Sequence, residues 1–411
     1  LNRLQDEMLA GNLDLRQTLF RLEQLEALRK SSAANLWPTL SLNATAGRDR
    51  TPTTNGSNIS SSSQVSLAAG YEIDLWNRLH DTEQAAQLQL QAGEKDAQTL
   101  LLSLTAQLAE NYFLALEQRG QLELVQQQLE LNRQLLATAS DRYRAGLASS
   151  DEIYQAQNNL LALEAQLPQL QTALNQYQQA IALLLGRYSF SELNTQFELP
   201  KVDTPIAIEL PASLLQKRPD IAAAMLQLQT VDHQLAAAIA ARLPAINLTA
   251  GLGRSSTQLV GGDLEGAIWN LAASLTQPLL DGGRRQAEVE RQQAVRGEQF
   301  AALQKTMLDA VSEVQTALNA EQNNATRSQR LISQLQVSGH NLELNRSNYR
   351  SGLTNSSVLL AAELHHLSIR SQLLSARRQL LSSRISLARA LGGSWMADEL
   401  KQQQHSLTED K

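Results

Sequence analysis

The stretch YRAGLASSDEIYQAQ, residues 143–157, is followed 206 residues later by YRSGLTNSSVLLAAE, residues 349–363. Each stretch lies between two long segments with helical periodicity. The same offset of 206 superimposes other pairs of positions: Asp14 on Asp220, Pro38 on Pro244, Gly47 on Gly253, and Leu185 on Leu391. Solenoid repeats have periods of roughly 20–50 residues, so a repeat of this length indicates two copies of one larger unit. The sequence therefore predicts a tandem duplication from about residue 11 to residue 393.

The composition narrows the function classes. The 411 residues are 43% hydrophobic but only 4% aromatic, and Gln, Leu, Ala and Ser dominate, which is typical of long helices. A net charge of −6 leaves no basic stripe to neutralise phosphates, which argues against a nucleic-acid partner. The chain has no cysteine, which excludes disulfides and thiolate metal sites, and we predict no cofactor.

Apolar runs in the sequence are short, and none approaches the ~20 residues that a transmembrane helix needs. The first residues, LNRLQDEMLAGNLDLRQ, lack the basic start and apolar stretch of a signal peptide. We expect that this end has been processed or trimmed. A membrane role would have to come from strands.

Helical periodicity is strong on both sides of each Tyr-Arg-small-Gly turn. In the helix after the first turn, apolar residues alternate steps of three and four, as in a coiled coil. These residues are Ile153, Ala156, Leu160, Leu163, Leu167, Leu170, Leu174, Tyr177, Ile181 and Leu184. The helix before the turn carries apolar residues spaced by seven from Leu101 to Tyr143. We therefore expect the two helices to pair antiparallel.

The two turns have the chemistry of helix ends. Gly146 and Gly352 can adopt the left-handed conformation that closes a helix. Leu147 and Leu353 follow them and are expected to make the apolar contact that accompanies such a turn.

Four stretches alternate apolar and polar residues with a period of two, which predicts strands of about ten residues, long enough to cross a membrane when tilted. The residues expected to face lipid are Leu42, Val65, Leu67, Tyr71, Ile246, Leu248, Trp269 and Leu271. Polar loops are predicted at residues 51–62 and 257–266. The alternative for each pair of strands is a hairpin in a soluble sheet.

The chain is predicted to divide into two repeats and a tail. Repeat 1, residues 1–205, holds a first helix, a β-hairpin at 39–75, a long helix at 79–142, a return helix at 151–186 and a linker. Repeat 2, residues 206–393, holds a helix at 219–242, a β-hairpin at 245–278, a long helix at 284–348 and a return helix at 355–391, and residues 394–411 form the C-terminal tail.

Helix lengths suggest how the elements are arranged. At 1.5 Å per residue, the first long helix would span about 96 Å, and helices 151–186 and 219–242 would span about 53 Å and 35 Å. We therefore expect these two shorter helices to stack end to end beside the long one, with a bend at Pro168.

Four strands cannot close a barrel, and open sheet edges are not tolerated in lipid. Bacterial barrels of this type begin at eight strands. Two chains would give a narrow barrel with little lumen. Three chains would give a 12-stranded β-barrel joined to a 12-helix α-barrel, a mostly α architecture with a transmembrane β part. We prefer three chains, and the family resemblance described next adds to this choice.

These residues resemble the outer-membrane factor family, the TolC/OprM-type channels of bacterial tripartite efflux pumps. The resemblance covers nearly the whole chain. It is carried by the duplication, the two YRxGL turns, EIDLWNRL after the second strand, QPLLDGGRR after the fourth, KRPDI at residue 217, and ALLLG and RALGG at the ends of the copies.

The resemblance implies a homotrimer. Residues 39–75 and 245–278 would form the outer-membrane β-barrel, and the rest would form a periplasmic α-helical barrel with an equatorial region made by the linker and the tail. It also implies a passive exit duct that expels drugs or other toxic small molecules. Its partners would be a periplasmic adaptor (membrane fusion) protein, an inner-membrane transporter and outer-membrane lipid.

In such channels the end that carries the turns narrows, and acidic residues gate the pore. Here Asp151 and Glu152 would form the gate, with Tyr143 and Arg144 on the preceding helix. Three copies would bring their carboxylates around one axis, where they would favour cations. The alternative is that both are ordinary carboxylates at a helix start.

The second copy departs from this pattern. It has Ser357 and Val358 where an acidic residue is usual, and Glu363 one turn later is a poor substitute, so a second acidic ring is in doubt. Tyr349 and Arg350 could bridge neighbouring helices and hold the end shut, or could be an ordinary packing pair.

Other chemistry is not supported. His365 and His366 are adjacent, so on a helix they point in different directions and do not form a metal site. No nucleotide loop or catalytic set stands out, and we do not expect an enzyme. The interpretation is an outer-membrane exit duct of a tripartite multidrug efflux system. Two alternatives are a type I protein-secretion duct and a soluble coiled-coil scaffold.

Overall fold

The computed structural model describes residues 1–54, 56–189, 199–200, 218–259 and 262–392. The predicted linker that follows residue 186 lies largely outside the described residues, and the predicted tail at 394–411 lies wholly outside them.

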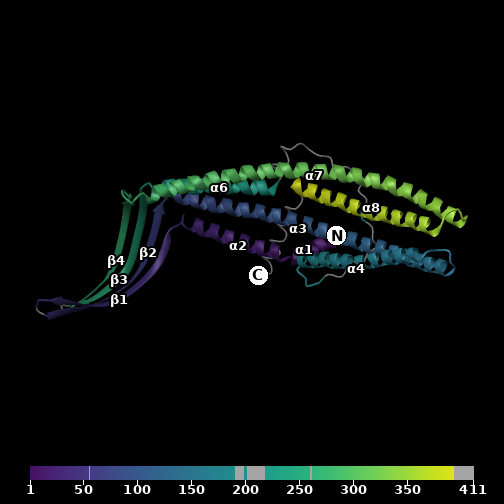
Figure 1. The fold of residues 1–411 in the computed structure, drawn as a ribbon. Helices are drawn as coiled ribbons and strands as arrows, with labels where there is room; N and C mark the ends of the chain where they lie inside the picture. Colours follow the sequence, from purple (N-terminus) through teal and green to yellow (C-terminus); the bar gives the residue numbers. More distant parts are fainter. Residues whose placement is uncertain (55, 190–198, 201–217, 260–261, 393–411) are drawn as a thin grey trace. The chain divides into compact units, whose positions relative to one another are not determined.

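The described chain is mostly helical with one small antiparallel sheet, which confirms this part of the predicted fold class (Figure 1). Its elements are α1 (Asn2–Gly11), α2 (Leu13–Ala34), β1 (Thr39–Thr53), β2 (Gly56–Ile73), α3 (Arg78–Arg144), α4 (Ser150–Leu184), α6 (Pro219–Ala240), β3 (Ala245–Leu259), β4 (Gly262–Thr276), α7 (Arg284–Arg350) and α8 (Ser356–Ala390).

The duplication is visible in the element bounds. The long helices α3 and α7 each have 67 residues, and the return helices α4 and α8 each have 35. Each helix of the second copy begins and ends 206 positions after its counterpart. Helix α4 passes through Pro168 without interruption. Among the described residues, no helix combines the length and apolar content needed to cross a membrane.

The chain forms two compact units, and α2, α3 and α7 contribute residues to both. Unit 1 comprises residues 1–19, 97–219 and 307–411, and unit 2 comprises residues 20–96 and 220–306.

In unit 2, the four strands lie side by side in the order β1-β2-β3-β4 and form one curved antiparallel sheet (Figure 1). The strands have 15 to 18 residues, so the predicted length of about ten and the predicted loops at 51–62 and 257–266 are wrong. Cross-strand pairing continues to Thr53 opposite Gly56 in the first hairpin and to Leu259 opposite Gly262 in the second. Most of the predicted loop residues therefore extend the ladder as polar strand.

The register places all eight residues that were expected to face lipid on one side of the sheet. Leu42 lies opposite Leu67, and Leu67 lies opposite Leu252. The apolar belt on this face comprises Leu40, Leu42, Val65, Leu67, Tyr71, Ile73, Ile246, Leu248, Leu252, Trp269, Leu271 and Leu275, with alanines between them. Their contact with lipid stays a prediction.

The opposite face of the sheet is polar and hollowed. Ser41, Ser66 and Asn270 are among the residues that line a cavity of about 450 Å³ there. Each strand therefore presents apolar side chains to one side and small polar ones to the other, as the period of two requires.

In unit 1, the core follows the helical pattern. Leu101, Leu108 and Ile181 are almost fully buried, as are Ile369 and Leu387 in α8. Helix α7 also packs on α8 through Leu331, Leu373 and Ala376. These contacts join the helices on either side of the second turn, as the spacing of their apolar residues predicts.

The ends of the return helices are held by residues of their own copy. The Asn12 Nδ2 donates to the carbonyl of Leu184 (2.8 Å), and the Arg218 Nη1 donates to the carbonyl of Ala390 (2.9 Å). Asn12 immediately precedes α2 and Arg218 immediately precedes α6. The expectation that the first return helix stacks on helix 219–242 is therefore wrong, because the carbonyl of Leu184 at its end accepts instead from Asn12, directly before α2.

Candidate functional site

The two helix-to-helix turns of unit 1, residues 145–149 and 351–355, are here called the tip turns. Gly146 and Gly352 both have φ of +70°, the left-handed conformation that the sequence predicts. In the first turn, Gly146 N donates to the Tyr143 carbonyl (2.9 Å) and Leu147 N to the Arg142 carbonyl (2.8 Å). The second turn repeats both bonds, and this paired pattern is the Schellman motif.

The leucines of the tip turns are mostly exposed, so the expected apolar contact covers little of their surface. Leu147 is 70% exposed and Leu353 is 75% exposed in the single chain. The sequence pattern does not reveal the exposure of these two leucines, because a Schellman turn can close through backbone hydrogen bonds alone.

The first tip turn presents charged side chains to solvent. Asp151 accepts a hydrogen bond from Gln155 Nε2 (2.7 Å), and Glu152 is exposed beside it. Arg144 pairs with Asp141 (3.2 Å), and Tyr143 is about half exposed. Among the described residues, neither Asp151 nor Glu152 has an ion pair. Both carboxylates are therefore accessible to solvent at the start of α4. Such accessibility is expected of a channel gate and equally of ordinary carboxylates at a helix start.

The second tip turn has no equivalent acid. Glu363 lies 3.3 Å from Arg346 and its side chain is 15% exposed, so it is engaged within the helix pair. Asn355 occupies the N-cap of α8, and its side chain accepts from Val358 N (3.1 Å). Asparagine is a favoured N-cap residue, so this role could have been predicted from its place before the helical pattern.

Among the described residues of one chain, Tyr349 and Arg350 do not bridge helices. Their side chains form no hydrogen bond or ion pair with another helix in the part of the chain that the structure describes. Tyr349 is 42% exposed. A bridge from this pair would need a partner in another copy of the chain.

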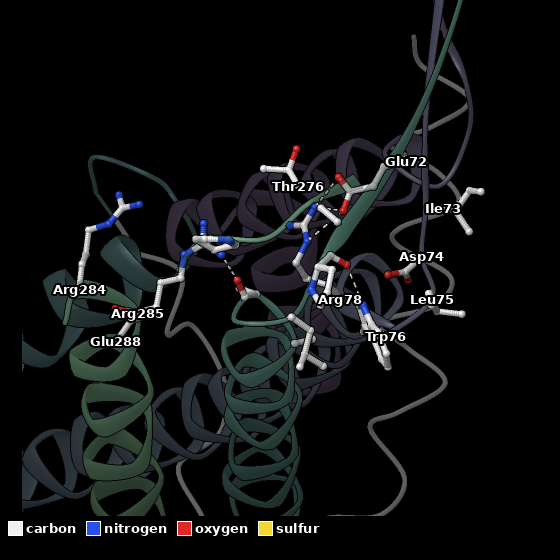
Figure 2. A pocket seen from close by; sticks show the side chains of 16 residues that line it. Glu72, Ile73, Asp74, Leu75, Trp76, Arg78, Thr276, Arg284, Arg285 and Glu288 are labelled. Carbon is white, nitrogen blue, oxygen red and sulfur yellow. Dashed lines mark hydrogen bonds and ion pairs between the residues drawn. The ribbon is translucent and has the colours of Figure 1, made fainter. Parts of the chain in front are cut away.

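In unit 2, the roots of the hairpins surround a cavity of about 540 Å³ (Figure 2). Arg78 Nη2 donates to both carboxylate oxygens of Glu72 at 2.8 Å, and Trp76 Nε1 donates to the Pro244 carbonyl (2.8 Å). Asp74 caps α3 by accepting from the backbone of the following turn (3.0 and 2.8 Å). The EIDLWNRL motif therefore anchors the first hairpin to its helix and to the entry of the second hairpin.

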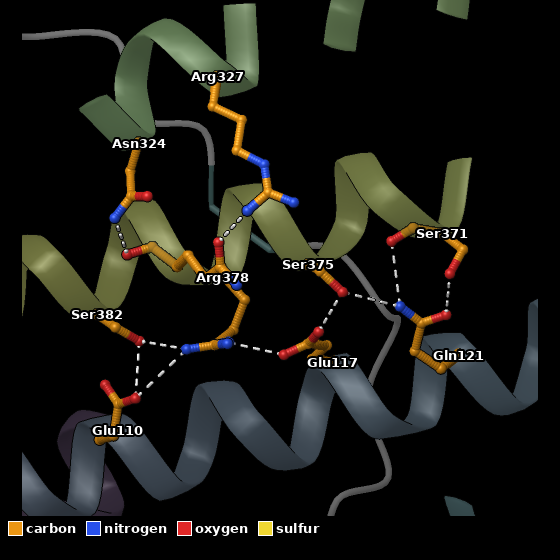
Figure 3. Close-up of polar contacts among 10 residues, drawn as sticks. Glu110, Glu117, Gln121, Asn324, Arg327, Ser371, Ser375, Arg378 and Ser382 are labelled. Atoms are coloured by element: carbon orange, nitrogen blue, oxygen red, sulfur yellow. Dashed lines mark hydrogen bonds and ion pairs between the residues drawn. The ribbon is translucent and has the colours of Figure 1, made fainter. Parts of the chain in front are cut away.

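A polar cluster joins the two copies across α3 and α8 (Figure 3). Arg378 Nε lies 2.6 Å from the Glu117 carboxylate, which is 6% exposed as a residue. Ser375 also donates to Glu117 (2.5 Å), and Ser382 donates to Glu110 (2.7 Å). We call these five residues the α3–α8 cluster.

Sequence reasoning missed the α3–α8 cluster because its partners are up to 272 residues apart. The positions 206 residues away from Glu117 and Arg378 hold Asn323 and Thr172. The ion pair between α3 and α8 therefore has no counterpart at the equivalent positions of α7 and α4.

A sheet with one apolar and one polar face, together with duplicated pairs of long helices, fits the class of outer-membrane channel proteins. The chain belongs to the outer membrane efflux protein family, whose profile matches residues 4–187 and again residues 210–393. The two matches are offset by the same 206 residues as the duplication.

Individual relatives agree with this assignment. The outer membrane protein OprJ of Pseudomonas aeruginosa is 31% identical over 407 residues, which cover 96% of this chain and 84% of OprJ. The toluene efflux pump outer membrane protein TtgI of Pseudomonas putida is 29% identical, and the match covers 97% of this chain and 86% of TtgI. A crystal structure of a membrane protein from Pseudomonas aeruginosa superimposes with a TM-score of 0.87 at 30% identity, covering 96% and 90% of the two chains.

The protein is thus an outer-membrane efflux duct that extends into the periplasm. The family is one of efflux channels rather than enzymes. No group of three or more potential metal ligands occurs among the residues that were described.

Proposed function

We propose that three copies of this chain form a passive, non-enzymatic exit channel for drugs and other toxic small molecules. A periplasmic adaptor and an inner-membrane transporter would deliver these molecules to it. The names of the relatives support the class of substrate, because TtgI belongs to a toluene efflux pump. The observation that carries the proposal is the two-faced sheet with two unpaired edges, which needs other copies in order to close into a barrel.

Exposed apolar side chains at the outer edges of the repeat support a neighbouring copy. Leu279, after β4, is 91% exposed, whereas its counterpart Ile73, 206 positions earlier, is 37% exposed. Trp37, before β1, is 73% exposed, whereas its counterpart Leu243 is 40% exposed. Ile73 and Leu243 lie at the junction between the two hairpins. A second chain would provide the same cover for Leu279 and Trp37.

The duplication also predicts the register between chains. Leu67 on β2 lies opposite Leu252 on β3, where the first copy meets the second. The counterpart of Leu67 is Ala273 on β4, and the counterpart of Leu252 is Ala46 on β1. If the second copy meets the first copy of the next chain in the same way, Ala273 lies opposite Ala46 of that chain, and three chains give twelve strands.

Cysteine cross-linking tests this arrangement, because the chain has no native cysteine. The variant Ala46→Cys/Ala273→Cys should form disulfide-linked dimers and trimers in membranes under oxidation. Within one chain, β1 and β4 are separated by two strands, a distance of about 14 Å that a disulfide cannot span. The matched control Ala44→Cys/Ala273→Cys is displaced by two residues on the same face and should cross-link poorly. A chain that stays monomeric in both variants would overturn the proposal.

In the proposed trimer, the first tip turns of the three chains meet around the channel axis. Asp151 and Glu152 are accessible and have no ion pair among the described residues, which supports a role as an acidic ring. Tyr143 and Arg144 would stand behind this ring. Tyr349 and Arg350, which have no partner helix within the described chain, would contact a neighbouring copy.

A further inference from the structure

We propose that Arg48 and Arg254 bind phosphorylated lipid headgroups of the outer leaflet, such as those of lipid A. The inference rests on the proposed function. In the outer-membrane barrel that this function requires, the apolar belt would face lipid and the hairpin ends would point away from the periplasm.

Both arginines lie on the face of the apolar belt, at its far edge. On β3, Leu252 is the last large apolar residue of the belt, and Arg254 is the next residue on that face. Arg254 lies opposite Val65 on one side and Ala267 on the other. Its stem can therefore lie along apolar surface while its guanidinium reaches the polar region beyond.

Arg48 is the counterpart of Arg254 in the first copy, 206 positions earlier. It lies opposite Ser61 on β2. In the proposed register between chains, its other neighbour is Leu271 of the next copy, the counterpart of Val65. The two arginines thus occupy the same place in the repeat. In a barrel of three chains, Arg48 and Arg254 would alternate around the circumference at one depth in the membrane.

Neither guanidinium is neutralised by another side chain in the part of the chain that the structure describes. Both side chains are exposed, and neither forms a hydrogen bond or ion pair among the residues described. Two acids lie nearer the tip of the second hairpin on the same face, and each is held by a neighbour. Glu265 accepts from Ser256 (3.2 Å), and Asp263 accepts from Gln258 (3.4 Å). In the first hairpin, Arg50 is held by Ser57 (3.0 Å) and adds a further positive charge.

The chemistry of these positions favours a phosphate attached to lipid. A guanidinium presents a planar fork of donors that matches two phosphate oxygens. An arginine on the lipid face of a barrel is tolerated far better near the interface than at mid-membrane, and there it meets the headgroups. The apolar belt directly below would hold the acyl chains of the same lipid, which a free anion lacks.

Retention of lipid A by the purified trimer tests the proposal. Native mass spectrometry would count the lipid A molecules bound per trimer after a detergent wash. We expect Arg48→Gln/Arg254→Gln to retain several-fold fewer than the wild type. The variant Arg48→Lys/Arg254→Lys keeps the charge but loses the fork, and should fall between them. The control Arg3→Gln/Arg330→Gln removes two exposed arginines from helices and should behave as wild type.

Competition identifies the source of the phosphate. Added lipid A should exchange with the bound lipid, and inorganic phosphate at the same concentration should not. Wild-type retention in Arg48→Gln/Arg254→Gln, or displacement of lipid A by inorganic phosphate, would overturn the proposal.

Cross-linking through Ala46→Cys/Ala273→Cys is measured in the same samples. Trimers without the expected loss of lipid would disprove the lipid site alone, whereas the absence of trimers would disprove the proposed channel. A double glutamine variant that fails to form trimers is replaced by the two single variants, each of which should lose part of the bound lipid.

Discussion

Single glycines determine how the long helices end. Gly352 has φ of +70°, and a side chain there would meet nothing within 4 Å, so only the backbone conformation resists substitution. We expect Gly352→Ala to destabilise the protein by roughly 1–2 kcal/mol. Gly297, inside α7 with equally open surroundings, is the matched control. Gly297→Ala should stabilise by about 0.5–1 kcal/mol, since alanine favours helix. Thermal unfolding of both variants measures the difference in their stabilities. Equal changes in the same direction would contradict the role given to the left-handed conformation of Gly352.

A partly buried histidine makes stability depend on pH. Desolvation lowers the pKa of His366 below its ordinary value of 6.5, with help from the nearby positive charges of Arg370 and Arg346. Its Nδ1 lies 3.0 Å from Ser338 Oγ. Above pH 6.5 the ring is neutral in both the folded and unfolded states. As the pH falls below 6.5 the unfolded chain takes up the proton first, so stability is lost.

The melting temperature of the wild type should therefore fall more steeply between pH 7 and pH 5 than that of His366→Gln. His365, exposed at the adjacent position, provides the control. His365→Gln should keep most of the wild-type slope, because the charge of His365 is the smallest of the causes that lower the pKa of His366. If both variants follow the wild type, His366 makes no such contribution.

At the scale of the elements, the α3–α8 cluster holds the first copy against the second. The side chains of Arg378 and Glu117 are only 17% and 8% exposed. Removal of one partner leaves the other charge buried, so Arg378→Met should cost about 3 kcal/mol in chemical denaturation. Adding Glu117→Gln should recover part of this loss, since no buried charge then remains. Arg291→Gln breaks an exposed pair with Glu288 and should leave stability unchanged. If Arg378→Met/Glu117→Gln lost as much free energy of unfolding as Arg378→Met alone, an ion pair between Arg378 and Glu117 would not explain the loss.

The two faces of the sheet give a second test at this scale. Leu67 lies on the apolar belt, and Ala68 faces the polar side, opposite Gly251. If the belt meets lipid, Leu67→Arg should cost about 2–4 kcal/mol near mid-membrane, and Ala68→Arg should cost much less. Unfolding of the folded protein in lipid vesicles measures both. Equal costs would mean that the belt is covered by protein.

The sequence predicts elements whose periodicity is regular, and fails where a contact is tertiary. Steps of three and four place α4 and α8 within a few residues of their bounds. The strands are underestimated because Arg48, Asp49 and Arg50 are not typical strand residues, yet they are paired with β2. The predicted stacking partner of the first return helix is wrong because the end of this helix is bound by Asn12. The bond from Asn12 to Leu184 spans 172 residues. No local pattern encodes such a distance.

The same limit applies to the candidate site. The tip glycines and the accessible acids of the first turn follow from local rules for helix ends. The pairing of Arg378 with Glu117, and the engagement of Glu363 by Arg346, depend on how helices pack and are found only in the structure.

At the scale of the whole molecule, the accessible acids of the first tip turn should set the ion preference of the channel. Planar-bilayer conductance of Asp151→Ala/Glu152→Ala should show a weaker preference for cations and a higher resting conductance, because the ring no longer attracts cations or constricts the pore. Asp141→Ala is the control, since Asp141 is an exposed acid on α3 already paired with Arg144. Unchanged conductance and selectivity in the double variant would mean that both residues are only helix-start carboxylates.

The equal spacing of the two copies also limits how such a protein can change in evolution. One residue inserted into α3 alone would turn everything beyond it by about 100° and advance it by about 1.5 Å relative to α7. Neighbouring helices would then no longer present matching surfaces. Length changes in these helices should therefore occur in both halves together or not at all, so that the two halves of the gene are free to diverge in residue type but not in residue number.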